Sequence, residues 1–348
     1  MRLERFEGCW TAIVTPMLPN GDVDYRGLEK NVAFQTSHGV NLVPTGTTGE
    51  SPTLDWDEHE RVIGETIRFA GGKVFVMAGT GSNSTREALR ATEHAVEMGV
   101  DAVLLVDCYY NGPSSLELRK EYYAPIAERF PGIFVTPYII PGRTGTYLEV
   151  EDLAILNRHY SNVRAVKEAT GDMERMVKTR RLLGSDFDIL SGDDDKTFEM
   201  MTNTDIGGTG VVSVVSNVVP GAVSDLTRSL LKGDKERAEQ LRAGLDPLFK
   251  IVTVKTTEQY EGFTVSCRFR NPLPINTLMN GLGIPAGPCR RPLGKMTPKG
   301  VAVVREAVRA VYEKNPEFLA PIEEHYKVRV ADRIADDRFW KTDEPGDV

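Results

Sequence analysis

Cysteine and histidine are scarce in this chain of 348 residues. The four cysteines lie far apart and form no CxxC pair; they are Cys9, Cys108, Cys267 and Cys289. This spacing predicts free thiols in a reducing cytoplasm rather than a disulfide framework or a zinc site. The five histidines are also scattered, without the spacing of metal ligands. We therefore expect neither a bound metal ion nor a metal-dependent reaction.

The chain also lacks long apolar runs and an excess of positive charge. No segment approaches the roughly 18 to 20 apolar residues of a membrane-spanning helix, and residues 1–7 lack the apolar run of a signal peptide. The net charge of −8 disfavours nucleic acid or a membrane surface as a partner. These features predict a cytoplasmic globular protein that acts on small molecules.

Motifs of nucleotide-binding proteins and serine hydrolases are absent as well. No G-x-G-x-x-G follows the first expected strand, and neither G-x-x-x-x-G-K-[ST] nor G-x-S-x-G occurs. The first absence disfavours a doubly wound open sheet, which is the architecture that competes with a barrel. What remains to be explained is a regular alternation of strands and helices.

Eight short apolar segments alternate with helical segments over the first two thirds of the chain. The expected strands cover residues 9–15, 40–44, 73–78, 102–106, 133–136, 163–167, 186–190 and 207–215. Such alternation predicts a parallel sheet, and eight strand–helix units in about 215 residues match a closed (β/α)8 TIM barrel. The sequence therefore predicts an α/β fold of this kind.

After Pro220 the pattern changes to helices only. The expected helices cover residues 223–231, 235–246, 276–280 and 299–312, and the segment 253–270 is expected to be irregular. The tail from Asn315 onward is charged but keeps apolar residues, which predicts packing on the body or on a neighbouring subunit; residues 343–348 are expected to fray. We divide the chain into a barrel (1–220) and a C-terminal helical region with an extended tail (221–348).

Reactive side chains fall at the carboxyl ends of the expected strands, where barrel enzymes have their active sites. Val163, Ala165 and Lys167 alternate, so the lysine amine ends an apolar strand face. Desolvation lowers the pKa of an ammonium group and favours its attack on a carbonyl. The other polar residues at strand ends are Thr47, Thr48, Tyr110, Tyr138 and Arg143.

Each of these residues also has a plain structural explanation, as a surface lysine, a turn, a packed aromatic or a solvated charge. Their joint placement on one rim favours a shared site instead. Lys167 could form an imine with a 2-oxo acid, while hydroxyl groups carry protons and Arg143 binds a carboxylate. The run of aspartates at 193–195 could hold a divalent cation, but its position before a helix favours N-capping.

Seven motifs support a more specific interpretation. They lie at residues 46–51, 109–111, 138–145, 166–171, 190–194, 207–220 and 271–274. In this order they resemble the dihydrodipicolinate synthase/N-acetylneuraminate lyase family of class I aldolases, over about residues 6–310. The resemblance implies a TIM barrel that forms a Schiff base with pyruvate without a cofactor. It also implies a homo-oligomer, usually a dimer of dimers.

The resemblance also implies roles for particular residues. Lys167 would be the Schiff-base lysine. Tyr138, Thr47 and Tyr110 would form the proton relay, with Tyr110 reaching across a dimer interface. The substrate-binding residues would be Thr48, Gly192 and Val212 for pyruvate and Arg143 for the second substrate. An allosteric site for lysine would comprise Ser51, Trp56, His59, Asn83, Glu87 and Tyr109.

Within the family, the Pro-Gly-Arg-Thr-Gly run after Tyr138 resembles the synthase branch, which condenses pyruvate with aspartate 4-semialdehyde in lysine biosynthesis. Three features depart from that branch: Ile139, the Asp107-Cys108 pair, and the extra length at 253–270 and in the tail. They leave open another pyruvate-dependent aldolase or a 2-oxo acid dehydratase, acting on a sugar acid or a hydroxy-oxo acid. A catalytically silent binding or regulatory barrel is the remaining alternative.

Overall fold

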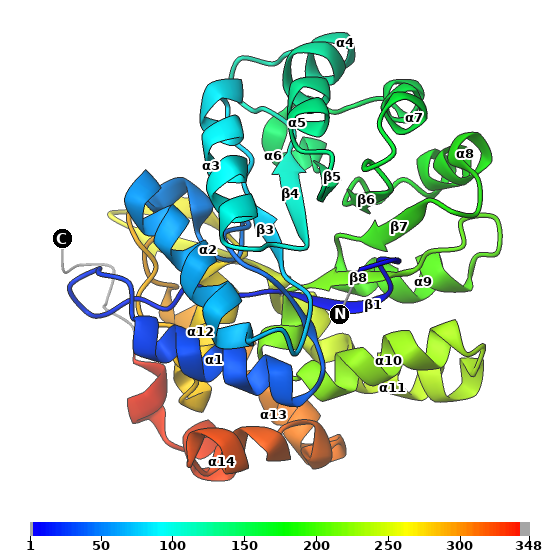
Figure 1. Cartoon of the computed structure of the whole chain (residues 1–348). Coiled ribbons are helices and arrows are strands. Elements are labelled where there is room, and N and C mark those ends of the chain that lie inside the picture. The colour runs from blue at the N-terminus through cyan, green and yellow to red at the C-terminus, as the bar shows by residue number, and fades with distance from the viewer. Residues whose placement is uncertain (1–2, 342–348) are drawn as a thin grey trace.

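A closed barrel of eight parallel strands forms the centre of the computed structural model, which describes residues 3–341 (Figure 1). The strands are β1 (Gly8–Ala12), β2 (Asn41–Val43), β3 (Met77–Gly79), β4 (Ala102–Val106), β5 (Phe134–Ile139), β6 (Ala165–Glu168), β7 (Asp188–Ser191) and β8 (Gly210–Ser213). Their order is β2-β1-β8-β7-β6-β5-β4-β3. A parallel bridge between Leu42 and Val76 joins the two end strands, so the sheet closes. The predicted barrel is confirmed.

Helices surround the strands on the outside of the barrel (Figure 1). They are α1 (Tyr25–Ser37), α2 (Trp56–Ala70), α3 (Thr85–Glu97), α4 (Ser115–Glu117), α5 (Ala124–Arg129), α6 (Pro141–Thr144), α7 (Val150–His159), α8 (Met173–Leu183), α9 (Thr197–Thr202) and α10 (Pro220–Leu231). One apolar cluster fills the interior of the barrel and includes Trp10, Met77, Leu104, Tyr138 and Val212. Since successive residues of a strand face opposite sides, the neighbours of these residues pack under the helices.

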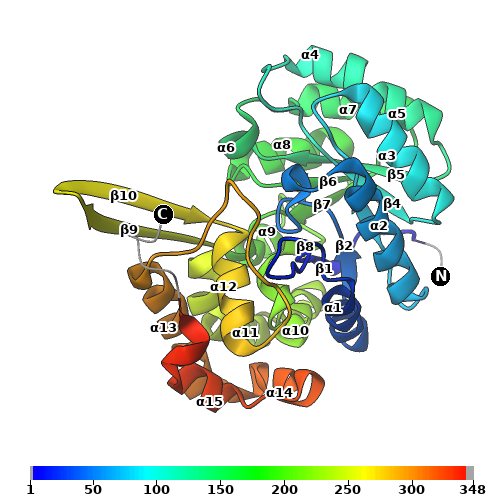
Figure 2. The ribbon, with the colours of Figure 1, turned by 90° about the vertical axis from the view of Figure 1, so that its left-hand side faces the viewer.

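The C-terminal region contains the one clear error of the predicted architecture. Its helices are α11 (Lys235–Phe249), α12 (Leu273–Leu282), α13 (Pro298–Lys314), α14 (Ala320–Tyr326) and α15 (Val330–Ala335). The segment expected to be irregular instead forms an antiparallel hairpin of β9 (Thr253–Tyr260) and β10 (Phe263–Arg270), which projects from the body (Figure 2). The turn residues Glu261 and Gly262 have φ of 48° and 86°, as a tight hairpin turn requires.

The tail packs on the body of the protein, as predicted. Leu319, Ile322 and Trp340 are buried in the same cluster as residues of α10–α13. The Tyr326 hydroxyl donates to Asn31 Oδ1 on α1 at 3.0 Å. The cluster also includes Cys9 of β1, so the barrel and the C-terminal region share one core. The domain boundary at residue 220, at the start of α10, stays a prediction. The expectation for residues 343–348 lies outside the described residues.

Two further findings bear on the predicted class of protein. All four cysteines are free, as their spacing predicts. Within residues 3–341, none of the helices has the length and apolar character needed to cross a membrane.

Candidate active site

Lys167 and Tyr138 form the centre of the candidate site, at the carboxyl ends of two neighbouring strands. Lys167 on β6 pairs in register with Tyr138 on β5. The Lys167 Nζ lies 4.0 Å from the centroid of the Tyr138 ring. The two side chains are only 6% and 5% exposed. The structure therefore places the amine and a phenol side by side in the protein interior, as predicted.

The amine of Lys167 has no carboxylate in direct contact among residues 3–341. Burial lowers its pKa to about 8, against the opposing charges of Asp193 and Asp194 and with the help of the positive charge of Arg143. The neutral fraction of the amine near neutral pH is therefore far larger than that of an ordinary lysine, although the ammonium form still predominates. The neutral form is the nucleophile in attack on a carbonyl carbon.

Tyr138 is held in its protonated form. Burial raises the pKa of its phenol to about 12, although Arg143 and a hydrogen bond with Thr47 lower it. A protonated phenol hydrogen-bonded to a hydroxyl group can donate its proton to a reacting group and take one back from the hydroxyl. Thr47 and Tyr138 thus come together as the first two members of the predicted relay.

The loop that carries Thr47 and Thr48 is fixed by the C-terminal region. Thr48 Oγ1 accepts a hydrogen bond from Asn271 Nδ2 at 2.9 Å, which leaves the hydroxyl proton to be donated elsewhere. Glu50, in the left-handed region at φ 57°, is buried. Its carboxylate accepts from the Arg290 backbone N–H at 2.9 Å. The residues before α12 and α13 therefore position the loop.

A cavity of about 220 Å³ opens beside Thr47 and Tyr138, and neither Lys167 nor Thr48 is among its lining residues. Its polar lining includes Thr47, Tyr138 and Arg143, and its apolar lining includes Leu104 and Ile140. The Arg143 guanidinium lies on α6, where its Nη2 donates to the Asn271 carbonyl at 2.9 Å. The cavity could hold a small organic acid between hydroxyl donors and a guanidinium.

Gly192 and Val212 lie on the other side of Lys167 and are not among the residues that line this cavity. Val212 is buried in the barrel interior together with Tyr138. Gly192 donates its N–H to the Glu168 carbonyl at 2.7 Å, and a Cβ at this position would lie 2.6 Å from the Cβ of Ala169. Only glycine fits there, so the turn after β7 can approach β6 closely.

Tyr110 does not join the site within a single chain. Its side chain is 95% exposed, and its backbone has φ of 75°, which is unusual for an aromatic residue. The backbone N–H of the preceding Tyr109 donates to Asn83 Oδ1 at 2.6 Å, which fixes the start of this segment. The predicted catalytic role of Tyr110 therefore depends on a second chain.

The residues predicted to bind lysine fall into two groups near the cavity. In the first, Ser51 Oγ lies 3.1 Å from His59 Nε2, and the His59 and Trp56 rings are 5.0 Å apart. Burial lowers the pKa of His59 to about 4, so its ring is neutral. The second group contains Asn83, Glu87 and Tyr109. Ser51 and Tyr109 both line the cavity and so connect it to the two groups.

The prediction that the aspartates at 193–195 cap the following helix is wrong. Asp193 makes no side-chain capping bond there. Asp194 instead accepts from the backbone N–H groups of Val214 and Val215, at 2.9 and 3.1 Å, because the turn after β8 lies beside the turn after β7. Within residues 3–341, no group of three histidine, cysteine or acidic residues is arranged to hold a metal ion.

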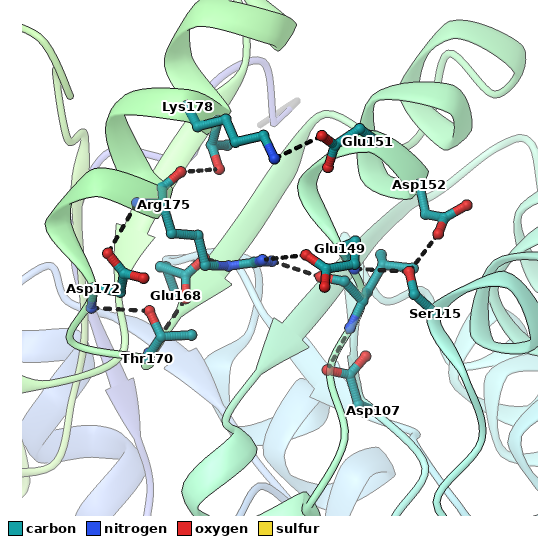
Figure 3. Close-up of polar contacts among 12 residues, drawn as sticks. Asp107, Ser115, Glu149, Glu151, Asp152, Glu168, Thr170, Asp172, Arg175 and Lys178 are labelled. Atoms are coloured by element: carbon teal, nitrogen blue, oxygen red, sulfur yellow. Dashed lines mark hydrogen bonds and ion pairs between the residues drawn. The ribbon is translucent and has the colours of Figure 1, made fainter.

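Sequence reasoning missed a buried ion pair on the other face of β6. Figure 3 shows Arg175 of α8 between Glu168 and Glu149. Arg175 Nε lies 3.1 Å from Glu168 Oε2, and its Nη2 donates to the Leu148 carbonyl at 2.6 Å. The sequence did contain a signal for this pair. A strand that places Lys167 inside the barrel turns Glu168 outward under a helix, and a carboxylate buried there needs a charged or hydrogen-bonding partner.

Asp107, one of the residues that depart from the synthase branch, lies in the same polar network as Arg175. Asp107 is fully buried and accepts from the Tyr123 hydroxyl at 2.6 Å and from the Leu148 N–H at 3.3 Å. Burial raises the pKa of this carboxyl to about 7, against these hydrogen bonds and the charge of Arg175. Asp107 thus supports the segment before Tyr109 rather than facing the cavity.

Comparison with known proteins gives a consistent result. The sequence model described as the dihydrodipicolinate synthetase family matches residues 5–311. A 4-hydroxy-tetrahydrodipicolinate synthase of Methanococcus maripaludis is 40% identical over 83% of this chain and 93% of its own length. The structure of the dihydrodipicolinate synthase of Aquifex aeolicus matches with a TM-score of 0.80 at 37% identity, over 87% of this chain and 97% of that chain. The structure of the 4-hydroxy-tetrahydrodipicolinate synthase of Methylacidiphilum fumariolicum matches with a TM-score of 0.81 at 34% identity, over 92% of this chain and 100% of that chain.

Replacing Arg175 with methionine should destabilise the protein, because it leaves Glu168 buried without a partner. We expect a loss of about 3–5 kcal/mol in the free energy of unfolding, measured by urea denaturation. The matched control is Lys178→Met on the same helix, which removes an exposed pair with Glu151 and should leave the free energy of unfolding nearly unchanged. Equal losses in the two variants would show that the buried pair does not support β6.

Proposed function

Because the chain belongs to the dihydrodipicolinate synthetase family, we propose that it is a 4-hydroxy-tetrahydrodipicolinate synthase, which condenses pyruvate with aspartate 4-semialdehyde in lysine biosynthesis. The observation that carries this proposal is the buried amine of Lys167 beside the Tyr138 ring. The amine has a lowered pKa, and the cavity next to it has hydroxyl and guanidinium donors for an acidic substrate. The enzyme is a lyase of the class I aldolase type.

The reaction would begin with attack of the neutral Lys167 amine on the ketone carbon of pyruvate. A C–N bond forms, and the ketone oxygen leaves as water after two proton transfers, which Tyr138 and Thr47 can carry. The protonated imine withdraws electrons, so the methyl group loses a proton and becomes an enamine carbon. This carbon adds to the aldehyde, and hydrolysis or ring closure then frees Lys167. The iminium is the electron sink, so the chemistry needs no cofactor.

The proposed binding residues are those that the family resemblance implies. The Thr48 hydroxyl and nearby backbone N–H groups suit the pyruvate carboxylate, with Gly192 and Val212 leaving space for the small methyl ketone. Arg143 suits the carboxylate of the aldehyde. Tyr110 would complete the proton relay from a second chain of a homo-oligomer, which we propose to be a dimer of dimers. The free thiols favour a reducing compartment, the cytoplasm.

Trapping with borohydride tests this function directly. We expect the protein incubated with pyruvate and borohydride to gain the mass of one reduced pyruvate, and peptide mapping to place it on Lys167. Lys167→Ala should give no adduct, whereas Lys178→Ala, which removes an exposed lysine, should react like the unchanged chain. If folded protein gives no adduct, or gives one on another lysine, the proposed imine is contradicted. If the adduct forms on Lys167 but aspartate 4-semialdehyde is not consumed, the second substrate is another aldehyde.

We also propose that lysine binds at the two residue groups beside the cavity. The neutral ring of His59 can accept a hydrogen bond, and the carboxylate of Glu87 can pair with an ammonium group. A dose series of lysine should lower the rate of condensation, and Glu87→Gln should weaken the inhibition several-fold while the borohydride adduct still forms. A flat response of the unchanged chain to lysine excludes this regulation.

A further inference from the structure

The hairpin of β9 and β10, which we call the hairpin arm (residues 253–270), starts beside the mouth of the cavity. Figure 2 shows it extending away from the body, with its base near α6 and α12. Its last residue, Arg270, donates from Nη2 to the Gly142 carbonyl of α6 at 3.1 Å. Gly142 is the neighbour of Arg143, which lines the cavity. The base of the arm therefore lies next to a segment that lines the cavity, although no residue of the arm is itself among the lining residues.

Two crossed hydrogen bonds fix the arm and α6 relative to each other. Arg270, on the arm, binds the backbone of α6, and Arg143, on α6, binds the carbonyl of Asn271 immediately after the arm. Each bond uses one of the five N–H donors of a guanidinium. Within residues 3–341 the remaining donors of both side chains are left for a ligand, and the backbone contacts hold the two guanidinium groups in place.

The face of the arm that carries Arg270 is basic. The strand register places Lys255 opposite Arg268 and Thr253 opposite Arg270, all on one face. The base of the opposite face packs on the body, where Val254 is buried and Phe269 contacts the core, whereas Phe263 and Val265 further out are exposed. The arm is thus anchored through its base, and the basic face is left uncovered.

These cations have no acidic partners within residues 3–341. None of Lys255, Arg268 and Arg270 forms an ion pair there, although the opposite face of the arm does, through Glu258 and Lys299 at 3.5 Å. Like charges placed directly across a hairpin destabilise it. Partial burial lowers the pKa of Arg143, and the charges of Arg270 and Arg268 lower it further, against the opposing effects of Tyr138 and Asp193. A cluster of cations that repel one another at a cavity mouth is stabilised when an anion binds.

We propose that the hairpin arm supplies Arg270 as a second carboxylate-binding residue beside Arg143, with Arg268 adding positive charge behind it, so that the acidic end of the aldehyde binds between α6 and the arm. This inference rests on the proposed function and deepens it, because it assigns selection of an anionic aldehyde to a segment outside the barrel. The planar fork of a guanidinium suits a carboxylate at this place.

Steady-state kinetics of Arg270→Gln test the inference. The KM for aspartate 4-semialdehyde should rise about tenfold, as expected for the loss of a charged hydrogen bond, while kcat, the KM for pyruvate and borohydride trapping on Lys167 stay unchanged. The rise of this KM with ionic strength should also become weaker. Arg270→Lys keeps the charge and should retain the dependence on salt. Arg268→Gln should have a smaller effect.

The matched control is Arg309→Gln, which removes the same charge from α13, where Arg309 pairs with Glu306. It should leave both KM values unchanged. Glutarate binding, measured by calorimetry, gives a readout without turnover, and Arg270→Gln should weaken it. The role of the arm is overturned if the unchanged and Arg270→Gln chains have the same KM for aspartate 4-semialdehyde. It is also overturned if both chains bind glutarate equally or if neither binds it. In each case intact trapping on Lys167 leaves the proposed function standing. Loss of trapping in the unchanged chain overturns the proposed function itself.

Discussion

Burial of the Lys167 amine is the constraint on which the site depends. The shift of its pKa from 10.5 to about 8 corresponds to about 3 kcal/mol of lost interaction for the charged form. Below pH 8 the folded chain carries this penalty in full. It is relieved as the pH rises from about 8 toward 10.5, because there the unfolded chain binds more protons than the folded one. The site thus gains a reactive amine at the expense of stability near neutral pH.

Charged groups on the other face of the same strand are paired. Glu168 follows Lys167 and points outward, where it pairs with Arg175 of α8. The C-terminal region positions the loop after β2, since Asn271 binds Thr48 and Arg290 binds Glu50. The reactive lysine is therefore unpaired inside the barrel, while the charged groups that position its strand and loops are paired outside it.

The sequence was sufficient for the barrel and for the centre of the site. Strand periodicity placed Lys167 at the end of an apolar face, and the carboxyl ends of the expected strands brought Tyr138, Thr47 and Arg143 to the same rim. The hairpin arm was missed because β9 is mostly polar and both strands are largely exposed; Phe263 at the tip is 71% exposed. The overlooked signal lies in β10, where apolar residues alternate with polar ones at Phe263, Val265, Cys267 and Phe269. The Glu-Gly turn of the arm also lacks the Asn or Asp that usually marks such a turn.

Other residues could not be placed from local pattern at all. Asp194 follows a strand and precedes a helix, which is typical of a cap, yet it binds N–H groups twenty residues further along the chain. Only the three-dimensional neighbourhood of the turns after β7 and β8 decides between these partners. The position of Tyr110 is also undecided by local pattern. Its own chain sets its backbone conformation, whereas its predicted catalytic role requires a second chain.

The pKa of Lys167 is the most direct test of this account. Trace acetylation with acetic anhydride between pH 6 and 11, quantified by mass spectrometry on the peptide that contains Lys167, reports the fraction of neutral amine. We expect half-maximal reactivity at about pH 8, and a lower midpoint in Asp193→Asn, which removes a charge that favours the ammonium form. A midpoint at the ordinary value of 10.5 would contradict the claim that burial makes Lys167 the nucleophile.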